Sequence, residues 1–214
     1  MKYTALIVAA GKGTRMGLAY NKVFIKLSEN VTVLEKTISI FEEDKKCQEI
    51  VVVINPNELK QFMIKPQKGN VVFVSGGERR MDSVYNGLMA VSENKVLIHD
   101  AARPYLSAEC LDRIVEAVFI NQAVVPGVAA KDTVKYVEDG KIKESLERSR
   151  LNHIQTPQAF DTDLVIECYK KAFEDGFEGS DDAEIVEHYS DVPIIVVEGD
   201  YKNTKITTIE DMPS

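Results

Sequence analysis

Short apolar runs alternate along the chain with segments in which apolar side chains recur every three or four residues. The runs cover residues 3–10, 49–54, 71–74, 95–99 and 123–126, and their continuous apolar character is typical of strands buried on both faces. Helical spacing recurs between them, in Leu34, Ile38 and Phe41, then Val84, Leu88 and Val91, then Leu111, Ile114, Val115, Val118 and Phe119. This alternation predicts an α/β protein of three layers, with a mostly parallel, twisted sheet between two layers of helices.

Two positions carry signals for the start of a helix. Thr32-Val33-Leu34-Glu35 has the pattern of a capping box, and Ser107 precedes the third apolar stripe, where its side chain can cap the helix. No repeat or linker divides the 214 residues, so we expect residues 1–214 to form a single domain.

The alternation stops at about residues 131–147. Two segments, 133–137 and 141–145, flank Glu138-Asp139-Gly140, and Asp-Gly between alternating residues is a hairpin signal. A hairpin this polar has little core of its own. We therefore expect it to project as an arm, in a position to pair with another subunit.

The loops at the carboxyl ends of parallel strands are where ligands bind in such sheets, which directs attention to the loops after Ala10, Val74 and His99. The first of them reads Gly11-Lys12-Gly13-Thr14-Arg15-Met16-Gly17. Met16 breaks the dinucleotide fingerprint, and Gly13 after Lys12 breaks the Walker A pattern. Glycines that admit backbone N–H groups to phosphate oxygens, next to an arginine fork, still favour phosphate binding over a plain glycine-rich turn.

Charge and cysteine content narrow the function classes. The formal net charge of −8 argues against nonspecific nucleic-acid binding. The charged side chains before the first acidic residue, Glu29, are all cations: Lys2, Lys12, Arg15, Lys22 and Lys26. This pattern indicates either anion binding in the first segment or cations that are simply solvated. The apolar run near the start is too short to span a bilayer. Three widely spaced cysteines without a metal-ligand pattern predict a reduced, cytoplasmic protein.

Sequence blocks distributed over the whole chain carry a family resemblance. The blocks are, in order, Ala9-Ala10-Gly11-x-Gly13-x-Arg15-Met16, Asn21-Lys22-x-Phe24, Gly76-Gly77-Glu78-Arg79, Asp82-Ser83-Val84, His99-Asp100-Ala101-Ala102-Arg103-Pro104, Asp132-Thr133, Glu147-Arg148-Ser149, Gln155-Thr156-Pro157-Gln158-Ala159-Phe160, Asp181-Asp182-Ala183 and Asn203-x-Lys205-Ile206-Thr207. Each block alone is weak, but the ordered set resembles the 2-C-methyl-D-erythritol 4-phosphate cytidylyltransferase family, with its Rossmann-like nucleotidyltransferase fold.

The resemblance implies a reaction between CTP and a polyol phosphate, assisted by Mg²⁺ or another divalent cation. A phosphate oxygen of the polyol phosphate would attack the α-phosphorus of CTP in line and release pyrophosphate. Because that oxygen is already ionised near neutral pH, no general base is required. The enzyme must supply cationic stabilisation and positioning.

The resemblance also assigns roles to individual residues. Arg15 and Lys22 would stabilise the transition state, and Arg148 and Lys205 would position the substrate phosphate. The nucleotide would be bound by Ala9, Ala10, Gly11, Gly13, Gly77, Glu78 and Ser83. The substrate would be bound by Asp100, Arg103, Thr133, Thr156, Ser180 and Asp181, with Asp100 holding either the metal or the substrate hydroxyls. His99 is expected to be a packed strand residue and not a base.

Without the resemblance these residues have ordinary interpretations. Asp100 would be a turn aspartate, Ser83 a residue in the first turn of a helix, and Arg148 and Lys205 solvated surface charges.

The sequence departs mildly from the family at Glu78, where aspartate is frequent, and at Ser180, which replaces threonine. In the family the arm reaches across a homodimer and brings the equivalents of Thr133 and Arg148 to the partner's site.

Three alternatives stay open at this point. A ribitol 5-phosphate cytidylyltransferase shares most blocks, although Ala101-Ala102 before Arg103 favours the methylerythritol enzyme. The second alternative is a nucleotide-binding module without catalysis, against which the retained cations argue. The third, a dehydrogenase-type dinucleotide domain, is weakened by Met16.

Overall fold

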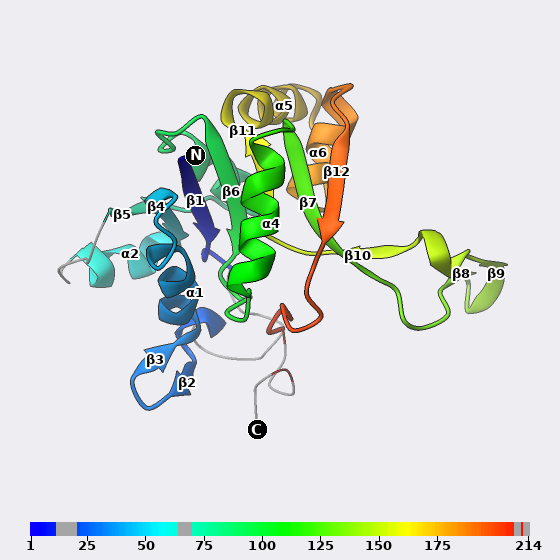
Figure 1. Cartoon of the computed structure of the whole chain (residues 1–214), viewed down its shortest axis with the longest axis horizontal. Coiled ribbons are helices and arrows are strands. Elements are labelled where there is room, and N and C mark those ends of the chain that lie inside the picture. Colours follow the sequence, from blue (N-terminus) through cyan, green and yellow to red (C-terminus); the bar gives the residue numbers. More distant parts are fainter. Residues whose placement is uncertain (12–20, 64–69, 208–210, 212–214) are drawn as a thin grey trace.

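The structure, a computed structural model, describes residues 1–11, 21–63, 70–207 and 211, without the side chains of residues 60–63. An eight-stranded sheet forms its centre (Figure 1), in the order β10-β7-β11-β6-β1-β4-β5 with β12 also paired to β7. Its strands are β1 (Tyr3–Val8), β4 (Cys47–Ile54), β5 (Val71–Ser75), β6 (Lys95–Asp100), β7 (Ala123–Ala129), β10 (Asn152–Ile154), β11 (Gln158–Asp161) and β12 (Ile194–Glu198). Among these, β10 and β11 run opposite to the rest, so the sheet is mixed but mostly parallel, as predicted.

Helices cover both faces of the sheet, which confirms the predicted three layers. The helices are α1 (Val33–Glu42), α2 (Pro56–Met63), α3 (Arg80–Leu88), α4 (Ala108–Val118), α5 (Thr162–Asp175) and α6 (Asp182–Tyr189). Side chains alternate along β1: Ala5 and Ile7 pack in the cluster that holds α1 and α4, whereas Leu6 packs with α3, α5 and α6. Both faces of the central strands are therefore buried, which is why their sequences are apolar without interruption.

The five predicted strands all occur, with shifted ends. β1 ends at Val8, two residues before the predicted end, and β7 continues to Ala129. The sequence did not predict β10, β11 or β12. β10 carries the polar residues Asn152 and His153 and is exposed throughout, so no apolar run marks it.

The two helix-start predictions have different outcomes. The capping box is present: the Thr32 hydroxyl accepts from the Glu35 amide at 3.2 Å, and the Glu35 carboxylate accepts from the Thr32 amide at 2.8 Å. Ser107 stands at the N-cap of α4, but the expected cap hydrogen bond is wrong, because its hydroxyl donates to Asp200 at 3.0 Å instead.

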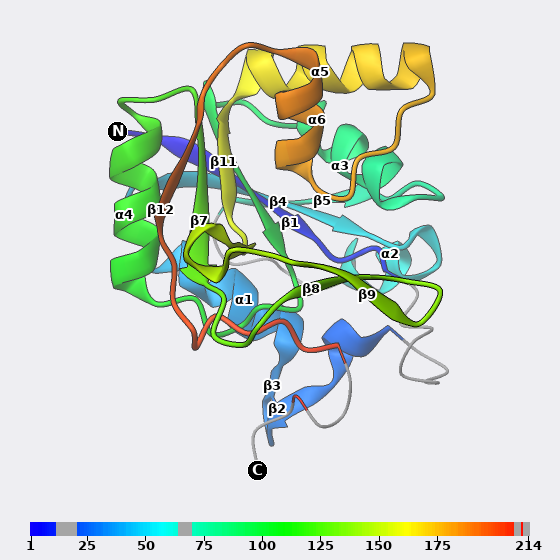
Figure 2. The ribbon, with the colours of Figure 1, turned by 90° about the vertical axis from the view of Figure 1, so that its right-hand side faces the viewer.

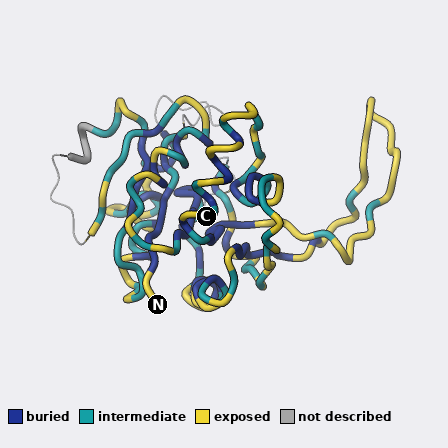
Figure 3. Tube along the Cα trace, turned by 90° about the horizontal axis from the view of Figure 1, so that it is seen from above, coloured by how far each residue is buried: buried dark blue, intermediate teal, exposed yellow. Residues whose placement is uncertain are grey.

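The predicted arm is present and projects from the body (Figures 1 and 3). It comprises β8 (Lys135–Glu138) and β9 (Lys141–Ser145), which among the described residues pair only with each other. The turn uses Asp139 and Gly140, both at positive φ, as an Asp-Gly hairpin requires. Large apolar side chains on this arm are left exposed, namely Tyr136, Val137 and Ile142.

Candidate active site

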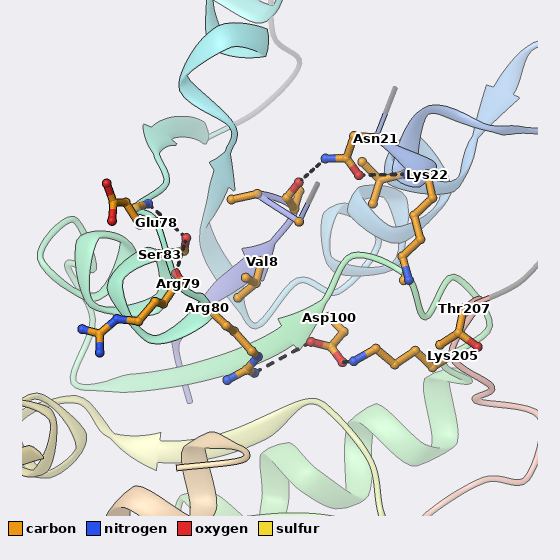
Figure 4. Close-up of a pocket in the computed structure, with 16 residues that line it drawn as sticks. Val8, Asn21, Lys22, Glu78, Arg79, Arg80, Ser83, Asp100, Lys205 and Thr207 are labelled. Carbon is orange, nitrogen blue, oxygen red and sulfur yellow. Dashed lines mark hydrogen bonds and ion pairs between the residues drawn. The ribbon is translucent and has the colours of Figure 1, made fainter. Parts of the chain in front are cut away.

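The carboxyl ends of β1, β5 and β6 converge on one cavity of about 280 Å³ (Figure 4). Its described lining carries the cations Lys22, Arg79, Arg80 and Lys205, against the acids Glu78 and Asp100. The remaining lining residues are Val8, Ala9, Ala10, Gly11, Asn21, Val23, Gly77, Ser83, Ala102 and Thr207. A cavity with four cations beside a glycine-rich turn is suited to a polyphosphate anion.

Asn21 precedes the short 3-10 helix η2 (Lys22–Phe24) and links it to the end of β1 by hydrogen bonds. Its side-chain amide donates to the Ala9 carbonyl at 2.6 Å, and its carbonyl oxygen accepts from the Val23 amide at 3.3 Å. Asn21 is almost completely buried, so these bonds are shielded from water. They fix the backbone from which the Lys22 side chain extends.

A tight turn after β5 forms the opposite wall. The Gly77 amide donates to the Ser83 hydroxyl at 3.0 Å, and that hydroxyl donates to the Arg79 carbonyl at 3.1 Å. A Cβ on Gly76 would lie 2.5 Å from the Ala10 Cβ, so only glycine lets this turn approach the end of β1. Ser83 thus lies in the first turn of α3 and shapes the wall of the cavity as well.

Asp100 ends β6 at the floor of the cavity. Its carboxylate lies 2.6 Å from the Lys205 Nζ and 3.8 Å from a terminal nitrogen of Arg80. Burial alone would raise the pKa of Asp100, but the charges of Lys205 and then Arg80 outweigh it and lower the pKa to about 2. Asp100 is therefore an ionised acceptor at neutral pH.

His99, the residue before Asp100, does not face the cavity. Its ring is fully buried and lies 3.0 Å from both the Arg103 carbonyl and the Thr156 hydroxyl. Burial lowers its pKa to about 4, so the ring is neutral near pH 7. This confirms the prediction of a packed strand residue. The Thr156 hydroxyl also accepts a hydrogen bond from the Asp100 backbone amide at 3.0 Å, which fixes the backbone of Asp100.

The segment after β12 passes beneath the carboxyl ends of the central strands (Figures 1 and 2). Asn203 anchors it by donating to the Thr156 carbonyl at 2.9 Å, and the Arg103 side chain donates to the Asn203 carbonyl at 2.7 Å. Further on, the Ile206 carbonyl accepts from the Lys22 Nζ at 2.7 Å. The path brings Lys205 to the cavity although 183 positions separate it from Lys22.

The cavity gathers more than half of the residues predicted for the site. Nine of them line it: Lys22, Lys205, Ala9, Ala10, Gly11, Gly77, Glu78, Ser83 and Asp100. Arg15 and Gly13 lie outside the described residues. Arg103 and Thr156 lie directly behind the lining, where they hold the tail segment and Asp100.

Four predicted residues lie elsewhere in this chain. Thr133 and Arg148 belong to the exposed arm region, where the Arg148 side chain donates to the Lys131 carbonyl at 2.9 Å. Asp181 caps α6 by accepting from the Glu184 amide at 2.8 Å, and Ser180 precedes it. The second Asp181 oxygen accepts from Gln158 at 2.8 Å, so both of its oxygens have partners inside the chain.

Sequence reasoning assigned no role to Asn21, Arg79, Arg80 or Thr207, all of which line the cavity. Asn21, Arg79 and Thr207 belong to the blocks that carry the family resemblance, which is the one signal that pointed to them. Arg80 has no such signal, because what distinguishes it is contact with acids 20 and 102 residues away.

Two absences hold for the part of the chain that the structure describes. No helix there combines the length and apolar character needed to cross a membrane. No cluster of three or more His, Cys, Asp or Glu side chains within those residues is arranged to hold a metal ion.

The sheet order and the cation-lined cavity at its carboxyl edge are those expected of a nucleotidyltransferase, and the comparisons with known proteins show that the chain is an enzyme of this class. A family model described as 2-C-methyl-D-erythritol 4-phosphate cytidylyltransferase matches residues 3–214. The chain belongs to this family.

Relatives and solved structures agree with the family. The chain is 40% identical to the enzyme of that name from Geobacillus thermodenitrificans, covering 99% of this chain and 94% of the relative. A Bacillus cereus relative of the same name is 42% identical, and the match covers 98% of this chain and 94% of the relative. The crystal structure of 4-diphosphocytidyl-2C-methyl-D-erythritol synthase from Anaerococcus prevotii superposes with a TM-score of 0.86 at 32% identity, covering 99% of this chain and 92% of that chain. The crystal structure of the 2-C-methyl-D-erythritol 4-phosphate cytidylyltransferase from Thermus thermophilus superposes with a TM-score of 0.82 at 34% identity, covering 99% of this chain and 96% of that chain.

Proposed function

We propose that the enzyme joins CTP to 2-C-methyl-D-erythritol 4-phosphate, forming 4-diphosphocytidyl-2-C-methyl-D-erythritol and pyrophosphate in the non-mevalonate route to isoprenoid precursors. The observation that carries the proposal is the convergence of Lys22, Lys205 and Asp100 on one cavity, opposite the Gly76-Gly77 turn. The names of the relatives supply the two substrates.

The cytidine would lie against the turn formed by Gly77, Glu78 and Ser83, with Ala9, Ala10 and Gly11 on the other side. Backbone groups of such a turn can recognise a pyrimidine edge without a charged side chain. The triphosphate would extend from there toward Lys22, and by the family resemblance Gly13 and Arg15 would contact it.

The reaction would be an in-line attack by an ionised phosphate oxygen on the α-phosphorus. The chain needs no general base for this, which fits a neutral, buried His99. Lys22 and Arg15 would stabilise the charge that develops on the transferred phosphate. Lys205 would exchange its contact with Asp100 for the substrate phosphate, and Arg148 would hold the same phosphate from the arm.

Asp100 is the residue that would hold a divalent cation such as Mg²⁺. It is ionised, and Mg²⁺ in nucleotide enzymes is commonly held by one or two carboxylates together with substrate phosphates. The ionised Asp100 carboxylate at the cavity therefore fits the metal. When bound, the cation would neutralise phosphate charge, and in its absence Asp100 can accept hydrogen bonds from substrate hydroxyls.

We further propose that residues 1–214 act as one domain in a homodimer assembled through the arm. In this chain Arg148 and Thr133 do not line the cavity, yet the arm exposes Tyr136, Val137 and Ile142. Exposed apolar side chains on a projecting hairpin are suited to burial against a second copy. The arm would then bring Thr133 and Arg148 of each subunit to the cavity of the other. Arg103, Thr156, Ser180 and Asp181 remain proposed substrate contacts, although none of them lines the cavity in the single chain.

A cytoplasmic location, without nucleic-acid or membrane partners, completes the proposal. Its support is the net charge of −8 and three free cysteines, Cys47, Cys110 and Cys168. Burial raises the pKa of the Cys110 and Cys168 thiols, which makes both unreactive as thiolates.

The test of the reaction is a pyrophosphate-release assay with CTP and Mg²⁺, run with methylerythritol phosphate and separately with ribitol 5-phosphate. We expect kcat/KM for methylerythritol phosphate to be higher by at least about 10-fold, as a site built for one polyol discriminates by its hydroxyl contacts. Preference for ribitol 5-phosphate would establish the alternative enzyme. No pyrophosphate with either substrate would favour a non-catalytic nucleotide-binding module.

Replacing Ser83 by alanine is expected to raise the KM for CTP by about 2- to 10-fold, the effect of one hydrogen bond worth about 0.5–1.5 kcal/mol. The Gly77 amide would lose its acceptor and the turn would loosen. Steady-state kinetics with varied CTP measure this. Ser92→Ala, which removes an exposed hydroxyl bonded to Glu49, is the matched control and should change nothing. An unchanged KM in Ser83→Ala would remove the turn from nucleotide recognition.

A further inference from the structure

Arg80, the first residue of α3, connects the cavity to the buried interior of the α5–α6 layer. Its two terminal nitrogens each donate to one oxygen of Asp182 at 2.8 Å, in a bidentate pair. The Tyr169 hydroxyl donates to the same carboxylate at 2.5 Å. On the cavity side, one of the two Arg80 nitrogens lies 3.8 Å from an oxygen of Asp100 (Figure 4).

Burying the Asp182 carboxylate costs free energy. Asp182 has no exposed surface, so much of the attraction that it gains from Arg80 offsets the cost of removing its charge from water. The Arg80 side chain stays 35% exposed and lines the cavity, and a bidentate arginine has a fixed orientation, which points to a role in the site.

Three cations surround the Asp100 carboxylate. Lys205 contacts one oxygen at 2.6 Å, the Arg103 Nε lies 3.9 Å from the same oxygen, and Arg80 faces the other oxygen. Lys205 extends from the segment after β12, whereas Arg80 is fixed by Asp182. When Lys205 turns to a substrate phosphate, Arg80 is the cation that stays beside the second Asp100 oxygen.

We propose that Arg80 is a positioning residue, which holds the Asp100 carboxylate in its productive orientation once Lys205 has moved to the substrate. Asp182 and Tyr169 keep the Arg80 guanidinium in place for this task. The inference rests on the proposed function of Asp100 and Lys205, and it assigns Arg80 no contact with the substrates.

The test is a double-mutant cycle with Arg80→Gln, Asp100→Asn and the two combined, measured as kcat/KM for the polyol phosphate. Each single change should lower kcat/KM by at least about 10-fold, and the combined variant should match Asp100→Asn within about 3-fold, because Arg80 acts through Asp100. Arg80→Lys keeps the charge without the fork and should recover part of the loss. Losses that multiply in the combined variant would overturn the proposal.

Two further variants separate this role from a general loss of folding. Asp182→Asn keeps the size of the side chain but releases the guanidinium, so it should lower kcat/KM in the same direction as Arg80→Gln, even if the latter fails to fold. Lys46→Gln removes an exposed ion pair with Asp112 far from the cavity and should leave kcat/KM unchanged. Normal kcat/KM in a folded Asp182→Asn would contradict the proposal.

A structural readout keeps the inference independent of the reaction. Crystal structures of the unsubstituted protein and of Arg80→Gln should show the Asp100 carboxylate turned to a different orientation in the variant. An unchanged Asp100 would refute the role of Arg80. If the unsubstituted protein released no pyrophosphate, the proposed function would fail, and this comparison would still decide whether Arg80 orients Asp100.

Discussion

Replacing Lys22 by alanine is expected to lower kcat by on the order of 100-fold or more, because a fixed cation at the transferred phosphate stabilises the transition state more than the ground state. The side chain extends from η2 into the cavity, and Asn21 fixes the backbone on which it stands. Its present hydrogen bond to the Ile206 carbonyl shows that the amine reaches the tail segment. Single-turnover kinetics at saturating CTP measure the effect on the chemical step. We expect the same magnitude for Arg15→Ala.

Lys26→Ala is the matched control for Lys22→Ala. Lys26 is an exposed lysine only four residues further on, in β2 (Lys26–Ser28), which pairs with β3 (Val31–Thr32) away from the cavity. Its removal should leave kcat unchanged. A Lys22→Ala variant that folds normally and retains near-normal turnover would refute the mechanism.

Mixing two inactive variants is expected to restore activity if the arm completes the partner's site. Lys22→Ala impairs the body of a subunit, and Arg148→Ala impairs its arm. In a mixed dimer, one site combines an intact body with an intact arm and the other combines both defects. After equal mixing and random exchange, roughly a quarter of the original activity should return, since about half of the dimers are mixed and half of their sites are intact.

The control for this experiment is a mixture of Lys22→Ala with Asp100→Asn. Both changes affect the body, so no intact site can form and no activity should return. Failure of the Lys22→Ala and Arg148→Ala mixture to recover, under conditions where subunits demonstrably exchange, would show that Arg148 serves its own subunit or none.

The sequence predicted the central sheet well because β1, β4 and β6 are buried on both faces, which leaves a continuous apolar run. The arm could also be predicted, because Asp139-Gly140 is a hairpin signal and both residues adopt the positive φ that this turn requires. β10 was missed because it is exposed along its length.

Some residues of the site are close together in the chain, whereas others are brought together only by the fold. Gly77 and Ser83 were assigned through the family resemblance, and they lie close together because the turn and the first turn of α3 are adjacent in the chain. The positions of Asp100 and Lys205 in one cavity required the family resemblance, as only the fold brings them to 2.6 Å. Arg80 could not be predicted, because its partner Asp182 is buried in another helix and nothing near Arg80 in the sequence indicates the pair.

The most direct test of the whole account is a crystal structure of the protein with CTP and the polyol phosphate bound. The account predicts that Lys22, Lys205 and Arg15 of one subunit, together with Arg148 of the partner subunit, surround the two phosphates between which the bond forms. A bound CTP whose triphosphate contacts none of these cations, or an Arg148 remote from every cavity in the assembly, would contradict it.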